Sequence, residues 1–274
     1  MNLKIHKQQR ERDPRVFGME NYINLVEVGA GRYGVVYDAT NQLTGASVMI
    51  KQFNRNGFFY GMREVEVSRS LPETPSALKI DEFFMSGDIL CVVYPIQHGF
   101  TSLGRHVALL RRNPPPAATE LTVEEIRSIM REFLSSLNEV HKAGIIHRGL
   151  TPGNVLVAFN PTRVRLFDFR SGKCLSVLHG LLDEDDASGN FTPPGDILRS
   201  TYQYFAPEML MEAAVYSREV DIWSAGVMFA GLVNGRPLYP SRATANGQLS
   251  SMFGVLGLLS INEMARIRGT DGFD

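Results

Sequence analysis

The sequence predicts an α+β fold in two parts, a small antiparallel β-rich part with one helix and then a larger, mainly α-helical part. Residues 22–96 contain short runs in which polar and apolar side chains alternate, separated by glycine-containing turns, as in antiparallel strands. After a proline-rich stretch at residues 111–120, apolar side chains recur with helical spacing. With 274 residues, 44% of them hydrophobic, the chain can bury a core of this size.

The β-rich part is predicted to contain five strands and one helix. Alternating runs predict the strands, and the helix is predicted from its apolar face and from Pro72, which follows it. The turn Ser86-Gly87-Asp88 has the composition of a hairpin between the last two strands. In chain order the expected elements are strands 22–28, 35–40 and 46–53, helix 61–71, and strands 78–85 and 89–96.

Two helices define the second part. Thr122 and Glu125 have capping-box spacing, and the helix that they begin ends at Gly144. Residues 222–233 are apolar all round but too few to span a bilayer, so we expect a helix buried in a helical layer. The apolar stripe of the first helix consists of Ile126, Met130, Phe133, Leu134, Leu137 and Val140.

Composition narrows the class of protein. The net charge of -1 does not favour nucleic acid or an anionic membrane as a partner of the whole molecule. Residues 1–20 form a basic arm, the one segment with charge for such a contact; it is either a solvated tail or a docking arm. Cys91 and Cys174 have no metal-site spacing and indicate reduced thiols. Without a signal peptide or an apolar run of membrane-spanning length, we expect an intracellular protein, cytoplasmic or nuclear.

A glycine cluster is the first motif with chemical meaning. Gly29, Gly31 and Gly34 match G-x-G-x-x-G. A dinucleotide-binding fingerprint requires a helix after the glycines, whereas here a strand follows at residues 35–40 and Lys51 lies on the next strand. Strand, glycine loop and strand resemble the protein kinase arrangement, in which a hairpin covers the nucleotide phosphates.

Further motifs resemble the kinase family in the same order along the chain. The resemblance implies a bilobal fold with an N-lobe at residues 21–97 and a C-lobe at 98–274, closest to the cyclin-dependent and mitogen-activated kinase group. The matching segments are Val48-Met49-Ile50-Lys51, Arg63-Glu64-Val65, His147 to Asn154, Asp168-Phe169-Arg170, Ala206-Pro207-Glu208 and Asp221-Ile222-Trp223-Ser224.

The resemblance also implies a site for ATP and Mg²⁺. Lys51 would contact the α- and β-phosphates, Glu64 would orient it, and Asn154 and Asp168 would be the metal ligands. The remaining nucleotide contacts would come from Gly29, Gly31, Gly34, Val36 and Leu156.

Two departures from the family pattern remove phosphotransfer chemistry. Gly149 stands where the family has the aspartate that accepts the substrate hydroxyl's proton, and glycine cannot accept a proton. Thr151 stands where a lysine neutralises the transferred phosphoryl group. We therefore expect no catalytic residue at either position and a pseudokinase that acts as a scaffold or structural subunit. The alternatives are a weak or atypical ATP-dependent Ser/Thr kinase and a nucleotide-sensing switch that binds ATP to stabilise one conformation.

Whether ATP binds is left open by the residues. Lys51, Glu64, Asn154 and Asp168 favour it, but they are equally explained as remnants that form ordinary polar contacts. Three substitutions oppose it: Met49 and Tyr94 narrow the adenine pocket, and Arg170 replaces a glycine. Arg170 has a second explanation, an ion pair with Asp168 in the place of the metal.

The last part of the chain, where the kinase resemblance ends, leads us to expect a protein partner. Phe205 precedes Ala206-Pro207-Glu208 in place of an arginine, so we expect core packing with Tyr202 and Tyr204 rather than control by phosphate. Tyr33 on the glycine loop is likewise expected to pack. The chain ends at Asp274, before helices found in related kinases, so the C-lobe is expected to be incomplete. We expect a protein partner to cover its lower face and to complement Glu208.

Overall fold

The structure is a computed structural model that describes residues 18–31, 33–112, 121–159, 162–175, 201–211, 217–257, 260 and 262. It divides into two compact units: one ends at Ser68 and resumes from Lys79 to His98, and the other contains Arg69–Leu78 and the chain from Gly99. The expected basic arm before Gly18, the proline-rich residues 113–120 and most of the segment after Asp168 lie outside the described residues.

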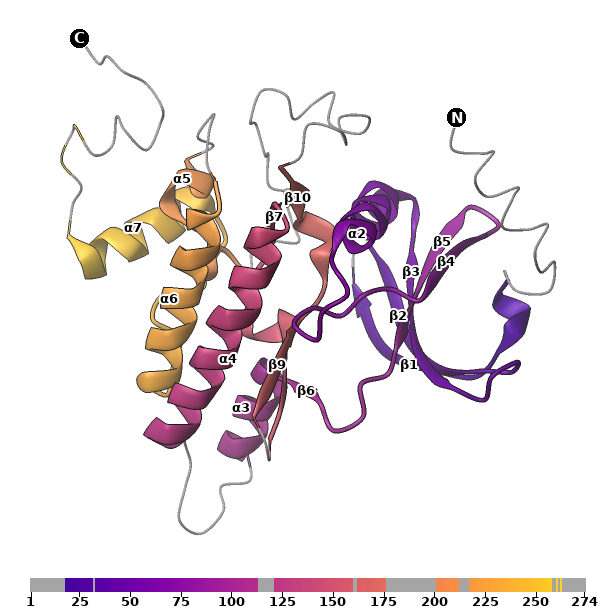
Figure 1. Cartoon of the computed structure of the whole chain (residues 1–274). Coiled ribbons are helices and arrows are strands. Elements are labelled where there is room, and N and C mark those ends of the chain that lie inside the picture. The colour runs from indigo at the N-terminus through magenta and orange to yellow at the C-terminus, as the bar shows by residue number, and fades with distance from the viewer. Residues whose placement is uncertain are drawn as a thin grey trace. The chain divides into compact units, whose positions relative to one another are not determined.

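The first unit is a five-stranded sheet with one helix, as the sequence predicts (Figure 1). Every neighbouring pair of strands is antiparallel, and the sheet order is β1-β2-β3-β5-β4. A Cβ on Gly61 of the helix would lie 2.7 Å from side-chain atoms of Phe53 and Leu90, so the helix packs closely on β3 and β5. The elements are β1 (Tyr22–Gly31), β2 (Gly34–Asn41), β3 (Ser47–Phe53), α2 (Phe58–Ser70), β4 (Glu82–Ser86) and β5 (Ile89–Pro95).

One face of this sheet supplies an apolar core. Tyr22 stacks on Phe84 with ring centres 5.9 Å apart, and its hydroxyl donates a hydrogen bond to Glu82. Burial and the neighbouring Glu82 raise the pKa of Tyr22 above its ordinary value. The buried residues of this cluster are Tyr22, Ala39, Val48, Ile50, Phe84, Cys91 and Val93.

The second unit is mainly helical. The capping box at Thr122 is present, and α4 runs along α6, to which the His141 side chain bonds at Asp221 (Figure 1). Short strands pair as β6-β8-β9 and as β10-β7. The helices are α3 (Leu103–Arg112), α4 (Val123–Lys142), α5 (Pro207–Leu210), α6 (Glu219–Val233) and α7 (Ala245–Leu256), and the strands are β6 (Thr101–Ser102), β7 (Ile145–Ile146), β8 (Val155–Ala158), β9 (Arg163–Leu166) and β10 (Lys173–Cys174).

Several details of the prediction are wrong. Residues 78–81 are not a strand, because their backbone pairs with Leu166 and Val93 through isolated bonds outside the ladder. In α4, Leu134 is 44% exposed, and Ile129 is buried in the stripe instead. Helix α6 is not buried all round: Ile222 is 50% exposed and Val233 is 55% exposed. Helices α3 and α7 were not predicted from the sequence.

The described helices include none that combines the length and apolar character needed to cross a membrane. Both cysteines are free thiols, as expected. Cys91 is buried, and burial raises the pKa of its thiol to about 11.

Candidate functional site

The glycine loop lies at the turn between β1 and β2, and the backbone requires glycine at one of its three positions. A Cβ on Gly34 would lie 1.6 Å from the carbonyl oxygen of Gln52 on β3, so no side chain fits there. A Cβ on Gly29 or Gly31 would meet no atom within 4 Å. Close strand packing thus explains Gly34, while nucleotide contact by Gly29 and Gly31 stays a prediction. Tyr33 is 7% exposed and packs on the Tyr60 ring, which confirms its expected packing role.

Lys51 and Glu64 form the predicted ion pair inside the first unit. Lys51 Nζ on β3 lies 2.7 Å from Glu64 Oε2 on α2, and the side chains are 14% and 1% exposed. Val36 on β2 faces Lys51 across the sheet. The helix and the sheet therefore hold a cation and a carboxylate together in a partly buried environment, where an ion pair is weakly screened.

Tyr94 is held by the same carboxylate. Its hydroxyl donates a hydrogen bond to Glu64 Oε1, and the residue is 2% exposed. In the sheet register Tyr94 is opposite Met49. The two side chains that we expected to narrow an adenine pocket are thus neighbours in the sheet, and Tyr94 is fixed by a polar bond as well as by packing.

The loop that follows β7 contains no proton acceptor at the predicted base position. The nearest atoms to a Cβ built on Gly149 are Ser171 Cβ at 3.4 Å and Ser171 Oγ at 3.5 Å, so the position has room for a side chain. Thr151 is 8% exposed and only its backbone bonds within the turn, to Asn154 N. The Asn154 side-chain amide donates to Gly149 O at 2.7 Å, so Asn154 holds the loop closed.

His147 cannot replace the missing base. It is fully buried, its Nδ1 accepts the Gly149 N–H at 3.3 Å, and its Nε2 lies 3.1 Å from Phe167 O. A carbonyl can only accept, so Nε2 carries the hydrogen and both ring nitrogens are engaged. Burial lowers the pKa of His147, which keeps the ring neutral.

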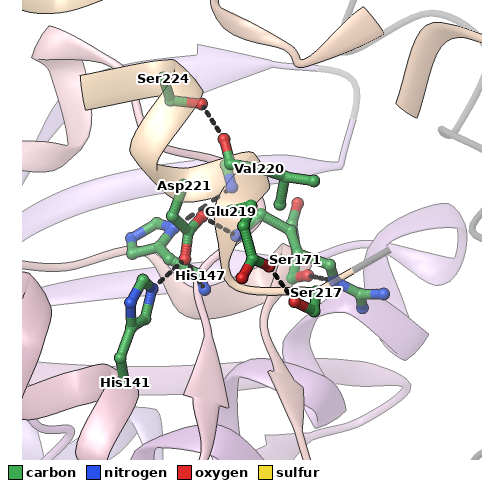
Figure 2. Close-up of polar contacts among 10 residues, drawn as sticks. His141, His147, Ser171, Ser217, Glu219, Val220, Asp221 and Ser224 are labelled. Carbon is green, nitrogen blue, oxygen red and sulfur yellow. Dashed lines mark hydrogen bonds and ion pairs between the residues drawn. The ribbon is translucent and has the colours of Figure 1, made fainter. Parts of the chain in front are cut away.

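Asp221 at the start of α6 anchors the loop (Figure 2). Its Oδ2 accepts the His147 N–H at 2.8 Å and lies 2.8 Å from His141 Nε2, while its Oδ1 accepts the Arg148 N–H at 2.8 Å. Asp221 is 0% exposed. Arg148, with φ 59°, sends its own side chain to Ser171 O at 2.6 Å and Gly172 O at 3.1 Å. This arrangement fixes the loop at one end through buried charged groups.

Asp168 follows β9 and has a left-handed backbone, with φ 66°. Its Oδ2 lies 3.3 Å from Arg170 Nη2, and the two side chains are 10% and 28% exposed. Leu156, predicted to contact nucleotide, lies on β8, half-buried and opposite Arg165 of β9. Asn154 and Asp168 belong to the same unit, and Asn154 O accepts the N–H of Phe167, the residue before Asp168.

The segment before α5 packs as predicted. Phe205 is 1% exposed and contacts Tyr202 with ring centres 5.9 Å apart. Burial raises the pKa of Glu208, and in the described part of the chain no basic side chain forms an ion pair with it.

The comparisons with known proteins now give the family. The model of the protein kinase domain matches residues 22–267. This chain belongs to the protein kinase domain family. It is 32% identical over 252 residues to cyclin-dependent kinase 4 of Xenopus laevis, covering 88% of this chain and 72% of that protein.

More distant relatives belong to the same group. The chain is 28% identical over 262 residues to cyclin-dependent kinase-like 4 of Mus musculus, covering 93% of this chain and 68% of that protein. It is 29% identical over 239 residues to a mitogen-activated protein kinase of Kluyveromyces lactis, covering 83% and 46%. The resemblance read from the motifs is therefore confirmed for the fold and the family.

Protein kinases use Mg²⁺ with ATP, so the fit of this metal to Asp168 and Asn154 can be tested on the geometry. Mg²⁺ prefers oxygen ligands at about 2.0–2.1 Å in near-octahedral geometry. Here a guanidinium is paired with Asp168 Oδ2, and the Asn154 amide nitrogen donates to the loop, which leaves Asn154 Oδ1 as the oxygen that a metal could use. With Arg170 paired to it, the Asp168 carboxylate does not fit Mg²⁺ in this arrangement, and the ion-pair explanation of Arg170 is favoured.

Two contacts of this kinase domain were missed by sequence reasoning. His141 was not singled out in the sequence, although it bonds to Asp221, and the hydroxyl of Tyr94 was not expected to reach Glu64. One signal for the first was present: an aspartate beside a long apolar helix requires buried partners. No signal along the chain brings Tyr94 to Glu64, because that contact depends on how α2 packs on the sheet.

Proposed function

We propose that this chain is a pseudokinase, a protein kinase-like protein that binds ATP, transfers no phosphate and works as a scaffold or structural subunit of an assembly. The observation that carries the proposal is Gly149 at the position of the catalytic base. The neighbouring imidazole of His147 has both nitrogens engaged, so it is no substitute. Loss of a general base alone costs about 10²–10⁴ in rate.

Retained residues support the nucleotide part of the proposal. In the first unit Lys51 is held by Glu64 at 2.7 Å, the pairing that orients a lysine toward phosphates in protein kinases. The second unit keeps Asn154 and Asp168, the family's metal-ligand positions, although Arg170 is paired with Asp168. These residues also support the second candidate, a weak or atypical Ser/Thr kinase that works without the usual base.

Phosphotransfer separates the two candidates. Purified chain with Mg²⁺-ATP and generic protein acceptors is expected to transfer no more phosphate than the Asp168→Ala variant. Turnover that Asp168→Ala abolishes overturns the pseudokinase proposal in favour of the weak kinase. The double variant Gly149→Asp with Thr151→Lys is expected to recover only part of a kinase rate, because Met49 and Arg170 are unchanged.

Nucleotide binding has its own test. ATP at a hundredfold excess over its dissociation constant stabilises a protein by about 2.7 kcal/mol through mass action. A thermal shift of the wild-type chain that Lys51→Ala removes supports binding. If ATP shifts the thermal unfolding of neither the wild type nor Lys51→Ala, ATP binding is overturned, and the retained kinase residues are explained as remnants.

The scaffold role requires a protein partner, and the exposed side of α6 supports one. Ile222, Phe229 and Val233 recur at helical spacing and are 50%, 47% and 55% exposed. The indole N–H of Trp223 is buried with no hydrogen-bond acceptor among the described residues. We propose a partner with an apolar surface, acting in the cytoplasm or nucleus. The proposed partner surface on α6 is contradicted if the chain is a monomer that binds no hydrophobic dye, and if Phe229→Glu changes neither its oligomeric state nor its dye binding.

A further inference from the structure

Arg170 is the feature of this chain that the kinase pattern does not explain. The third position of the Asp168-Phe169-Arg170 motif is glycine in the family, and here a long cationic side chain turns back onto the first residue of the motif. Its Nη2 lies 3.3 Å from Asp168 Oδ2, and Asp168 is 9% exposed. The charge of the carboxylate that a metal would need is thus already balanced by the Arg170 side chain of the same chain.

The ion pair with Arg170 disfavours sharing of this carboxylate with a divalent cation. Two cations on one partly buried carboxylate repel each other strongly, because the low local dielectric weakens screening. The second expected ligand, Asn154, is neutral and adds no charge to offset a metal. A guanidinium, unlike Mg²⁺, does not require an octahedral set of oxygen ligands. Its planar fork of N–H donors matches the oxygens of a phosphate.

We propose that the Arg170 guanidinium takes the place of the divalent cation, so that the chain binds the phosphates of ATP without Mg²⁺. Asp168 acts as a positioning residue that orients the guanidinium, and Arg170, with 28% of its side chain exposed, contacts the phosphates. This inference rests on the proposed ATP binding and specifies its chemistry: Arg170, rather than a protein-bound Mg²⁺, holds the polyphosphate, whether or not the ATP itself carries Mg²⁺.

The test measures ATP binding by calorimetry to the full chain, once with excess EDTA and once with Mg²⁺. For the wild type, we expect the two dissociation constants to agree within about twofold. For Arg170→Gly, which restores the family residue, we expect binding in EDTA to weaken about tenfold or more, with recovery in Mg²⁺. Arg170→Ala should lose binding in EDTA, whereas Arg105→Ala, which removes an exposed arginine from α3 of the same unit, should bind as the wild type does.

A second experiment measures the binding of Mn²⁺ to the chain in the absence of nucleotide, with electron paramagnetic resonance as the detection method. The wild type is expected to leave Mn²⁺ free, and Arg170→Gly to bind it more tightly. Thermal unfolding of every variant checks that the fold is intact, and Arg170→Lys, which keeps the charge, should retain part of the EDTA binding if Arg170→Gly is unstable.

The outcomes separate the two proposals. A wild-type chain that binds ATP about tenfold more weakly in EDTA, or that takes up Mn²⁺ as well as Arg170→Gly does, overturns the role of Arg170 and leaves ATP binding intact. A chain that binds ATP in neither medium overturns the proposed nucleotide binding, and this inference with it.

Discussion

The loop from His147 to Asn154 is held very differently at its two ends. At the first end, the backbone N–H groups of His147 and Arg148 both bond to a fully buried Asp221. At the other end, Gly149 and Thr151 provide no charged group at all, and the Asn154 amide bonds only back to the loop, at Gly149 O.

The difference separates groups that fold the domain from groups that do chemistry. Removing Asp221 would leave several buried donors without a partner in any version of this protein, active or not. The base and the lysine that are missing at Gly149 and Thr151 take part in phosphotransfer and in none of the contacts at the first end of the loop, so their loss leaves those contacts intact. If stable folding is the only requirement on the chain, the residues at the first end of the loop must be kept, whereas those at the second end are free to change.

The comparison predicts its largest effect at Asp221. Asp221→Ala removes the acceptor of the His147 and Arg148 N–H groups and the partner of His141 at once. We expect the free energy of unfolding to fall by about 3–5 kcal/mol, as when one partner of a buried charged network is lost. Urea denaturation measures it. Glu219→Ala, an exposed carboxylate two positions earlier, is the control, and an equal loss in both variants would refute the anchoring role.

Arg148 tests the second contact of the same end. Arg148 is 2% exposed, and its side chain donates to Ser171 O at 2.6 Å and Gly172 O at 3.1 Å. We expect Arg148→Ala to lower the free energy of unfolding by about 2–3 kcal/mol, because two buried carbonyls lose a donor. Arg148→Lys should recover only part of this loss, since an ammonium lacks the planar fork that reaches both oxygens. Full recovery by lysine would mean that charge alone matters there.

A pH effect is expected from His147. Its folded-state pKa is depressed by burial, and the charges of Asp221 and Asp168 oppose this without reversing it. Below the unfolded-state value of about 6.5 the unfolded chain binds more protons, so stability falls as pH decreases toward the folded-state pKa; above about 6.5 the contribution is constant. A difference of one between the pKa of His147 in the folded and unfolded states changes the free energy of unfolding by about 1.4 kcal/mol.

Denaturation between pH 5 and 8 measures this effect as the difference between the wild type and His147→Gln, because His106 and the buried carboxyl groups also titrate. Burial lowers the pKa of His106 as well, so His106→Gln is the matched control, with the same sign and a smaller slope because His106 is less buried. A stability difference that does not change with pH would show that His147 is equally easy to protonate in both states.

Local signals in the sequence predicted much of the fold and one part of the site. Alternating strands, the capping box at Thr122 and the ordered kinase motifs are encoded by neighbouring residues, and the structure confirms the sheet and α4. The pairing of Lys51 with Glu64 followed from the family resemblance.

What could not be predicted depends on packing between distant elements. The hydrogen bond from Tyr94 to Glu64 joins β5 to α2, and the one from His141 to Asp221 joins α4 to α6. The exposed side of α6 was missed for a related reason: an all-apolar sequence does not state which of its faces is covered. The pairing of Arg170 with Asp168 was one of two explanations that the residues allowed, and only the geometry favours it.

The smallest effect is expected at Gly149, one residue from Arg148. A Cβ there would meet Ser171 at 3.4 Å, an ordinary contact distance, and Gly149 is absent from the glycines that have positive φ. Replacing such a glycine by alanine restricts the unfolded chain and stabilises by about 0.4–1 kcal/mol, so Gly149→Ala should unfold at the same urea concentration as the wild type or slightly higher. Arg148→Ala is the matched neighbour, expected to lose about 2–3 kcal/mol. If Gly149→Ala instead lost more than about 1 kcal/mol, the glycine would be explained by a backbone requirement of the loop. The contrast between the two ends of the loop would then fail at the residue on which the assignment of a missing base depends.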